Sequence, residues 1–304
     1  ARTYKSMEDR GELTLRIHAA SDLFGDLDSA AEDAAFCTGD KVRANLVKQF
    51  VDGVFTTHTA LLLEDYADAP GNRGIQLCEL DKIANAIKEA HKRELSIKIH
   101  CLGDRAAQFT LDCFEDAIAM YGKNSARHAI EHMELIHDED IKRLRPLGIV
   151  PSVQPEHLGL MPTWEGEEYR FVLGEERAAR TWRFKTLLDA AGVLALGSDC
   201  PVVDNNPFYA IHRGCTRVHD DGLPEGGWNP SEKLTVAELL KGYTIGSSYS
   251  VSREEELGTL EAGKLADIVI VDRNLFAVSP EEIRNAKVEM TIMDGEIIYE
   301  EGKK

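Results

Sequence analysis

Residues 95–121 read LSIKIHCLGDRAAQFTLDCFEDAIAMY and contain one strand followed by one helix. Residues 95–101 form a short, mostly apolar run, which is typical of a buried strand. Between Arg105 and Tyr121, apolar residues recur at helical spacing, at positions 106, 107, 111, 114, 117 and 118. A strand that leads directly into an amphipathic helix predicts one β/α unit of a parallel sheet.

The same alternation continues on both sides of this unit. Further strands are predicted at residues 13–18, 45–52, 127–132, 148–154 and 192–199, and further helices at residues 138–147, 183–191 and 235–243. Such alternation fits either a doubly wound sheet or a (β/α)8 barrel of the TIM type. No GxGxxG loop follows a predicted strand, which makes a nucleotide-binding sheet the weaker alternative. We therefore predict an α/β barrel over residues 1–254.

The last part of the chain has a different pattern. Residues 266–272 (ADIVIVD) predict a strand, and residues 288–293 and 296–300 flank Asp294-Gly295, a dipeptide typical of a hairpin turn. Two β-rich segments around a tight turn predict a small β domain, part of a β-sandwich, over residues 255–304.

Charge and cysteine content limit the choice of partners. The formal net charge is −18, which repels nucleic acid and anionic membranes and leaves a small-molecule substrate as the expected partner. None of the six cysteines forms a CxxC pair, so free thiols and a cytoplasmic location are expected. No apolar run is long enough to predict a transmembrane helix.

Three polar residues come at the ends of predicted strands. His100 ends one strand, His132 ends another, and Asp199 ends a third. The carboxyl ends of barrel strands carry the chemistry of that fold, and imidazole and carboxylate groups bind zinc and similar divalent ions. Taken singly, each histidine could be a hydrogen-bonded core residue and the aspartate a helix cap. Their shared position on separate strands favours a metal site, with Asp199 as the catalytic residue.

The sequence resembles the amidohydrolase superfamily, in the subgroup of N-substituted formamide deformylase-like metal-dependent hydrolases. Residues 100–106 (HCLGDRA) are similar to its HxxGDRA segment, residues 130–132 (IEH) to its IEH segment, and residues 197–201 (GSDCP) to its GSDxP segment. Residues 257–267 resemble its GxLExGKxAD signature, which leads into the β-sandwich. The matches occur in order along nearly the whole chain, as the C-terminal portion of such an enzyme.

The resemblance implies a role for each matching residue. His100 and His132 would bind one or two divalent ions, zinc being expected, and Asp199 would bind metal and act as general base toward the activated water. Lys48 would be a further ligand, carboxylated in some members, although a lysine paired with a neighbouring acid is an equal alternative. The implied reaction is hydrolysis of a C–N bond in an amide or cyclic amide.

Two residues of the predicted loops are candidates for substrate binding. His157 and Trp164 follow the strand at residues 148–154, and loops after barrel strands set substrate choice. Both could equally be ordinary loop residues.

The chain departs from the family pattern in one important way. The family carries an HxH pair on its first strand, whereas no two of the ten histidines here are separated by one residue. Only six barrel strands are predicted, and a closed barrel needs eight. We expect either a truncated chain or a natural loss of the metal pair, with impaired metal binding and little activity. Unpaired strand edges would allow a homo-oligomer.

The missing pair leaves a second function open, a non-catalytic regulatory or binding protein built on a degenerate barrel.

Overall fold

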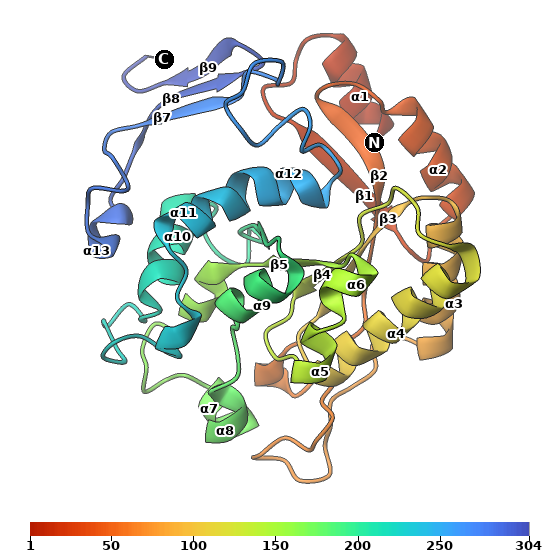
Figure 1. Ribbon diagram of the computed structural model, residues 1–304, viewed down its shortest axis with the longest axis vertical. Helices are drawn as coiled ribbons and strands as arrows, with labels where there is room; N and C mark the ends of the chain where they lie inside the picture. Colours follow the sequence, from red (N-terminus) through yellow and green to blue (C-terminus); the bar gives the residue numbers. More distant parts are fainter. Residues whose placement is uncertain (304) are drawn as a thin grey trace. The chain divides into compact units, whose positions relative to one another are not determined.

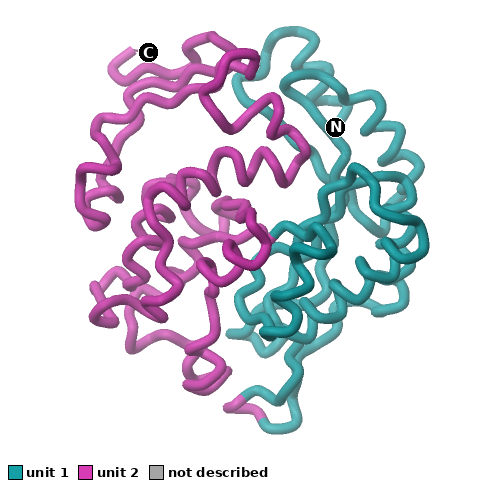
Figure 2. The backbone as a smooth tube through the Cα atoms, in the orientation of Figure 1, with its two compact units in different colours: residues 1–66, 70–150 teal, residues 67–69, 151–304 magenta. Residues whose placement is uncertain are grey.

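The strand at the centre of the predicted β/α unit forms β3 (Ser96–Cys101) in the computed structural model, and every residue of β3 is buried. A strand buried on both faces is what a parallel sheet covered by helices requires. The structure describes residues 1–303. These form two compact units, unit 1 with residues 1–66 and 70–150 and unit 2 with residues 67–69 and those from 151 onward (Figure 2).

Unit 1 contains a parallel sheet in the order β1-β2-β3-β4. Its strands are β1 (Ile17–Asp22), β2 (Val42–Phe50), β3 and β4 (Ala129–His132). Its helices are α1 (Arg2–Asp9), α2 (Leu27–Phe36), the 3-10 turn η1 (Phe55–Thr57), α3 (Leu80–Lys92), α4 (Asp104–Tyr121), α5 (Asp138–Ile141) and α6 (Leu144–Leu147).

The core of unit 1 lies between this sheet and its helices. Helices α3 and α4 pack against each other and against β3 (Figure 1). Ile83 and Ile87 of α3, with Leu111 and Phe114 of α4, are fully buried. Their helical spacing puts each pair on one face, so both helices cover the sheet with apolar side chains.

Unit 2 contains the parallel pair β5 (Val150–Val153) and β6 (Ala195–Leu196), where β5 begins at the boundary between the units. Its helices are η2 (Pro155–Gly159), α7 (Tyr169–Leu173), α8 (Glu175–Ala178), α9 (Phe184–Ala191), α10 (Pro207–Thr216), η3 (Pro230–Glu232), α11 (Val236–Lys241), the π-helix η4 (Gly242–Gly246), α12 (Ser247–Ser250) and α13 (Pro280–Ile283). Helix α10 packs against η2, α11 and α13. Parallel strands with intervening helices in both units confirm the α/β class.

The end of the chain forms an antiparallel sheet in the order β7-β8-β9, with β7 (Ile268–Val271), β8 (Val288–Met293) and β9 (Glu296–Glu300). The predicted turn joins β8 to β9, and Asp294 and Gly295 both have the positive φ angles of a tight hairpin, 57° and 82°. A domain boundary between residues 254 and 255, and a complete sandwich, stay predictions.

Several predicted elements were displaced or divided. The strand expected at residues 13–18 begins only at Ile17 and continues to Asp22. The helix expected at residues 138–147 is split into α5 and α6, because Pro146 has no N–H to donate to the Lys142 carbonyl. The strand expected at residues 192–199 is reduced to β6, and its last residue, Asp199, has left the extended conformation.

The helix predicted at residues 235–243 is longer than expected. Thr235 caps it, and Glu238 three residues later completes a capping box. The helical run then continues through the π-helix η4 to Ser250.

Among the residues that the structure describes, no helix is long and apolar enough to cross a membrane.

Candidate functional site

Two of the predicted metal ligands lie side by side in unit 1. Phe50 of β2 is in register with His100 of β3, and Cys101 of β3 is in register with His132 of β4. The rings of His100 and His132 meet edge to face, with 4.5 Å between their centroids. Both side chains are buried. The sheet therefore brings two imidazoles together at the carboxyl ends of neighbouring parallel strands.

A buried carboxylate lies behind this pair. Asp52, which follows β2, is completely buried, and its Oδ1 atom lies 3.8 Å from Nε2 of His100. Its two oxygens accept three backbone hydrogen bonds, from the N–H groups of Leu61 (2.9 Å), Leu102 (3.1 Å) and Gly103 (2.9 Å). Burial raises the pKa of Asp52 to about 7, although the three N–H donors oppose that rise.

The Asp52 carboxylate joins two loops of unit 1. One of them follows His100 directly, and the other carries Leu61. Asp52 is not among the site residues predicted from the sequence. Its signal is a carboxylate at the mouth of a strand, in Val51-Asp52-Gly53, the same pattern that identified Asp199.

Lys48 lies on β2, in register with Lys98 of β3. Its Nζ atom lies 5.3 Å from the centre of the Phe50 ring, a cation–π contact. Lys98 is buried, and burial lowers its pKa to about 8. The two lysines therefore lie side by side in the sheet, each two residues before the paired residues Phe50 and His100. A ligand role for Lys48 stays a prediction.

Unit 2 brings together two further predicted residues. His157 lies in η2, directly after β5, and Asp199 follows β6. Nε2 of His157 lies 3.8 Å from Oδ2 of Asp199. His157 is buried, whereas the Asp199 side chain is 45% exposed. A buried imidazole beside an accessible carboxylate suits proton transfer or metal binding.

The backbone is unusual at two of the predicted residues. His132 has φ 75° and Asp199 has φ 59°. Non-glycine residues adopt this left-handed region in only a few per cent of cases, and they cluster at functional sites. At both positions the left-handed residue is the one that carries the predicted metal donor.

Trp164 belongs to an aromatic cluster in unit 2. Its ring centre lies 5.3 Å from that of Trp228 and 5.7 Å from that of His219, and the Arg170 guanidinium lies 4.5 Å above it. These contacts hold Trp164 half-buried against residues of a distant segment of unit 2. Its part in substrate binding stays a prediction, as does that of His157.

A family comparison places the whole sequence among known proteins. The sequence model described as "Amidohydrolase family" matches residues 1–299. This match covers the strand ends that carry His100, His132 and Asp199.

Individual relatives are similar over most of this chain. The protein LONG AFTER FAR-RED 3 of Arabidopsis thaliana is 34% identical over 254 residues, which are 83% of this chain and 42% of that protein. An N-substituted formamide deformylase of Arthrobacter pascens is 26% identical over 85% of this chain and 46% of its own length. A solved structure, an uncharacterized metal-dependent hydrolase from Pyrococcus horikoshii, is 26% identical with a TM-score of 0.78, over 92% of this chain and 55% of that one. The chain therefore spans about half the length of the relatives it matches.

Proposed function

Because this chain belongs to the amidohydrolase family, we propose that it carries the proton-transfer residue and part of the metal-binding set of a metal-dependent hydrolase. The observation that carries the proposal is the arrangement of donors at strand ends, with two buried imidazoles in unit 1 and an imidazole beside a carboxylate in unit 2. The proposal extends to a (β/α)8 barrel for the whole protein, since the family fold would bring these strand ends to one face.

The donor chemistry fits a divalent ion. His132, His157 and Asp199 each offer one ligand atom of a type that binds such ions, and we propose His100 as a fourth donor. Neutral imidazole nitrogens with one carboxylate oxygen are a ligand set that zinc accepts. Lys48 is proposed as an additional ligand only in carboxylated form. An ion held there would polarise a carbonyl group and make water more acidic.

The residues of the chain then perform the proton transfers. Asp199 accepts a proton from the attacking water, and its exposed carboxylate can pass that proton to the departing nitrogen of an amide. The buried His157 imidazole lies beside this carboxylate, with 3.8 Å between Nε2 of His157 and Oδ2 of Asp199. Asp52 fixes the loop after His100 through three N–H groups. These roles describe hydrolysis of an amide or cyclic amide C–N bond.

Metal affinity is expected to be weak in this chain. Its ten histidines include no HxH pair, so an ion would have fewer imidazole ligands than the family pattern provides. Activity would then belong to the whole protein.

The proposed function is tested with the whole protein from which this chain comes. Zinc is added to metal-free protein, and hydrolysis of a panel of amides, cyclic amides and esters is measured. We expect turnover of at least one amide, and a loss of about 100-fold or more in kcat in Asp199→Asn, as for removal of a general base. Absence of turnover on the whole panel would favour a non-catalytic binding protein, and an unchanged rate in Asp199→Asn would exclude Asp199 as the general base.

A further inference from the structure

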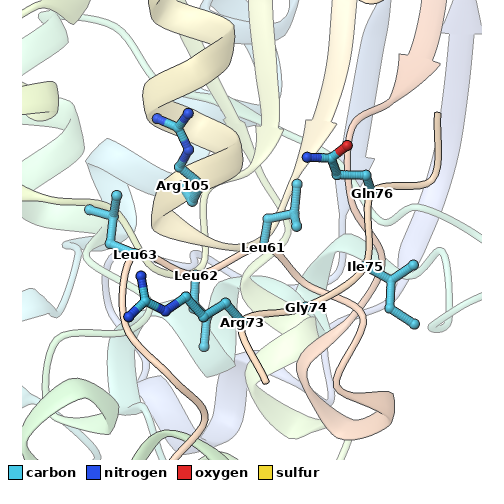
Figure 3. A pocket seen from close by; sticks show the side chains of 8 residues that line it. All are labelled: Leu61, Leu62, Leu63, Arg73, Gly74, Ile75, Gln76 and Arg105. Carbon is cyan, nitrogen blue, oxygen red and sulfur yellow. The ribbon is translucent and has the colours of Figure 1, made fainter. Parts of the chain in front are cut away.

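A pocket of about 630 Å³ lies within unit 1, close to the Asp52 loops (Figure 3). Residues 61–63 and 73–76 line it, together with Arg105. Figure 3 shows Arg105 on helix α4 and Arg73 on the neighbouring loop, with residues 61–63 drawn between them. The volume is in the range of small-molecule sites, roughly 300–1,000 Å³. The lining combines leucine side chains with two guanidinium groups and one amide.

The two guanidinium groups differ in their charge balance. Nε of Arg73 donates to Oδ1 of Asp65 at 2.7 Å, so that cation is neutralised by an ion pair. Nη1 of Arg105 donates at 2.7 Å to Oε1 of Gln108, which is a neutral amide. Within residues 1–303, no carboxylate side chain makes an ion pair with Arg105. The chain has 53 acidic and 35 basic residues, so an arginine with no acidic partner beside a pocket is unexpected.

Backbone contacts hold Arg105 against the apolar wall. Its N–H donates to the Leu61 carbonyl at 3.1 Å, and Oδ1 of Asp104 accepts N–H bonds from Arg105 and from Leu63, both at 2.9 Å. The cation and the leucines are thus joined through the main chain. Arg105 also lies in the first turn of α4, only five residues after His100.

We propose that this pocket binds a small molecule that carries a carboxylate, with Arg105 as the anion-binding group. A guanidinium presents a planar pair of N–H donors that matches a carboxylate, and residues 61–63 with Ile75 offer apolar surface for the rest of the molecule.

A phosphate is a poorer match for this pocket. The N–H groups of Gly103 and Arg105 at the start of α4 already donate to Asp52, Asp104 and Leu61, which leaves fewer backbone donors for a dianion. Only one of the two guanidinium groups is without an ion pair, whereas a phosphate dianion carries about two negative charges.

One consequence rests on the proposed function. If the whole protein hydrolyses amides, a carboxylate site in the loops next to His100 points to amides that bear a free carboxylate, such as N-acyl amino acids.

Binding is measured on metal-free protein, by isothermal titration in the presence of EDTA, so that no hydrolysis takes part. The ligands are N-acetyl-L-leucine, its neutral analogue N-acetyl-L-leucinamide, and inorganic phosphate. We expect N-acetyl-L-leucine to bind at least about 10-fold more tightly than the amide, as for one charge-assisted hydrogen-bonded pair.

Variants of Arg105 test whether this residue causes the preference for N-acetyl-L-leucine over its amide. Arg105→Gln should bind the two leucine compounds equally, and Arg105→Lys, which keeps the charge but loses the planar fork, should retain part of the difference. Arg10→Gln removes another arginine of unit 1, one paired with Glu12 on the surface, and should leave binding unchanged. If Arg105→Gln does not fold, Arg105→Lys and the comparison of ligands on the unaltered chain decide the matter.

Three results would overturn the carboxylate site: equal binding of the acid and the amide, an undiminished difference in Arg105→Gln, or tighter binding of phosphate than of N-acetyl-L-leucine. Failure of the proposed function is distinguishable, because it would abolish turnover in the zinc-loaded whole protein and leave these titrations as predicted.

Discussion

The Oδ1 atom of Asp52 lies 3.8 Å from Nε2 of His100, and the same oxygen accepts the N–H of Leu102, two residues further along the chain. A single carboxylate therefore contacts both the side chain at the end of β3 and the backbone that leaves it. The imidazole also lies 3.2 Å from the Gly53 carbonyl oxygen through the same nitrogen. His100 lies near the end of strand β3, and Asp52 fixes the backbone of the loop that follows this strand.

Replacing Asp52 should therefore loosen the end of β3. In Asp52→Ala, three buried N–H groups lose their acceptor, and the free energy of unfolding should fall by at least about 3 kcal/mol. Asp52→Asn keeps the shape but turns one N–H₂ group toward those donors, so we expect a smaller loss of stability together with weaker zinc binding. Urea unfolding and zinc titration measure the two effects, with the exposed Asp116→Asn as control. A variant Asp52→Asn that matches the parent chain in both would contradict this role.

Gly103→Ala should separate the two loops that Asp52 joins. A Cβ atom at Gly103 would lie 2.0 Å from the carbonyl oxygen of Leu61, which is backbone and cannot move aside cheaply. We expect a loss of about 1–3 kcal/mol in the free energy of unfolding, as for overpacking a core. Gly197→Ala is the matched control, since no described atom lies within 4 Å of its Cβ position. Equal stability of the two variants would contradict the close approach.

Metal binding should depend on His132 and should be weak. We expect zinc to be lost from this chain on dialysis against a chelator, and His132→Ala to weaken zinc binding by about 10-fold or more, as for loss of one imidazole ligand. His137→Ala changes a nearby histidine outside the proposed ligand set and should have no effect. Elemental analysis and competition titration supply the measurements. A stoichiometric zinc that survives dialysis would disprove weak binding, and an unchanged affinity in His132→Ala would disprove the ligand role.

Stability should fall in acid because of a buried histidine pair in unit 1. Ile97 N–H donates to Nδ1 of His128 (3.2 Å), so the ring proton of His128 is on Nε2 and is donated to Nδ1 of His91 (2.8 Å). His91 in turn donates from Nε2 to the Gly122 carbonyl (2.8 Å). Burial lowers the pKa of His128 to about 3, with the neighbouring His91 acting in the same direction.

The direction of the change in stability with pH depends on whether the folded or the unfolded chain takes up the proton first. As pH falls below about 6.5, the unfolded chain protonates this histidine while the folded chain does not, so the stability present at neutral pH is lost progressively down to about pH 3. The expected contribution is a slope of about 1.4 kcal/mol per pH unit within that window. This slope should disappear in His128→Asn, whose amide oxygen can still accept the Ile97 N–H. The slope should remain in the control variant His137→Asn. Urea unfolding at several pH values tests it, and identical slopes for His128→Asn and the parent chain would exclude the effect.

The sequence predicted those parts of the fold that depend on local pattern. Strand β3, helix α4 and the β8–β9 hairpin were predicted to within a few residues, because apolar spacing and an Asp-Gly turn act through near neighbours. Several helices were not predicted, among them α1, α2, α3 and α10. Of these, α1 has no buried residue and α2 only Ala30, so neither has a broad apolar stripe in the sequence.

Contacts between distant segments account for what was missed in the candidate site. Two left-handed residues, His132 and Asp199, fall at predicted strand ends, yet their backbone angles depend on the surrounding chain. The Asp52 interactions join residues nine, 50 and 51 positions apart, and no periodicity reveals such contacts. The pairing of His157 with Asp199 was missed for the same reason.

The three N–H groups held by Asp52 also bear on how the protein would exchange hydrogen with solvent. Leu61, Leu102 and Gly103 lie outside helices and strands or at their very start, where amide protons normally exchange quickly. Because their acceptor is fully buried, these protons should instead persist in deuterated water as long as those of β3. The slowest-exchanging part of unit 1 would then extend past its regular secondary structure into the loops beside His100.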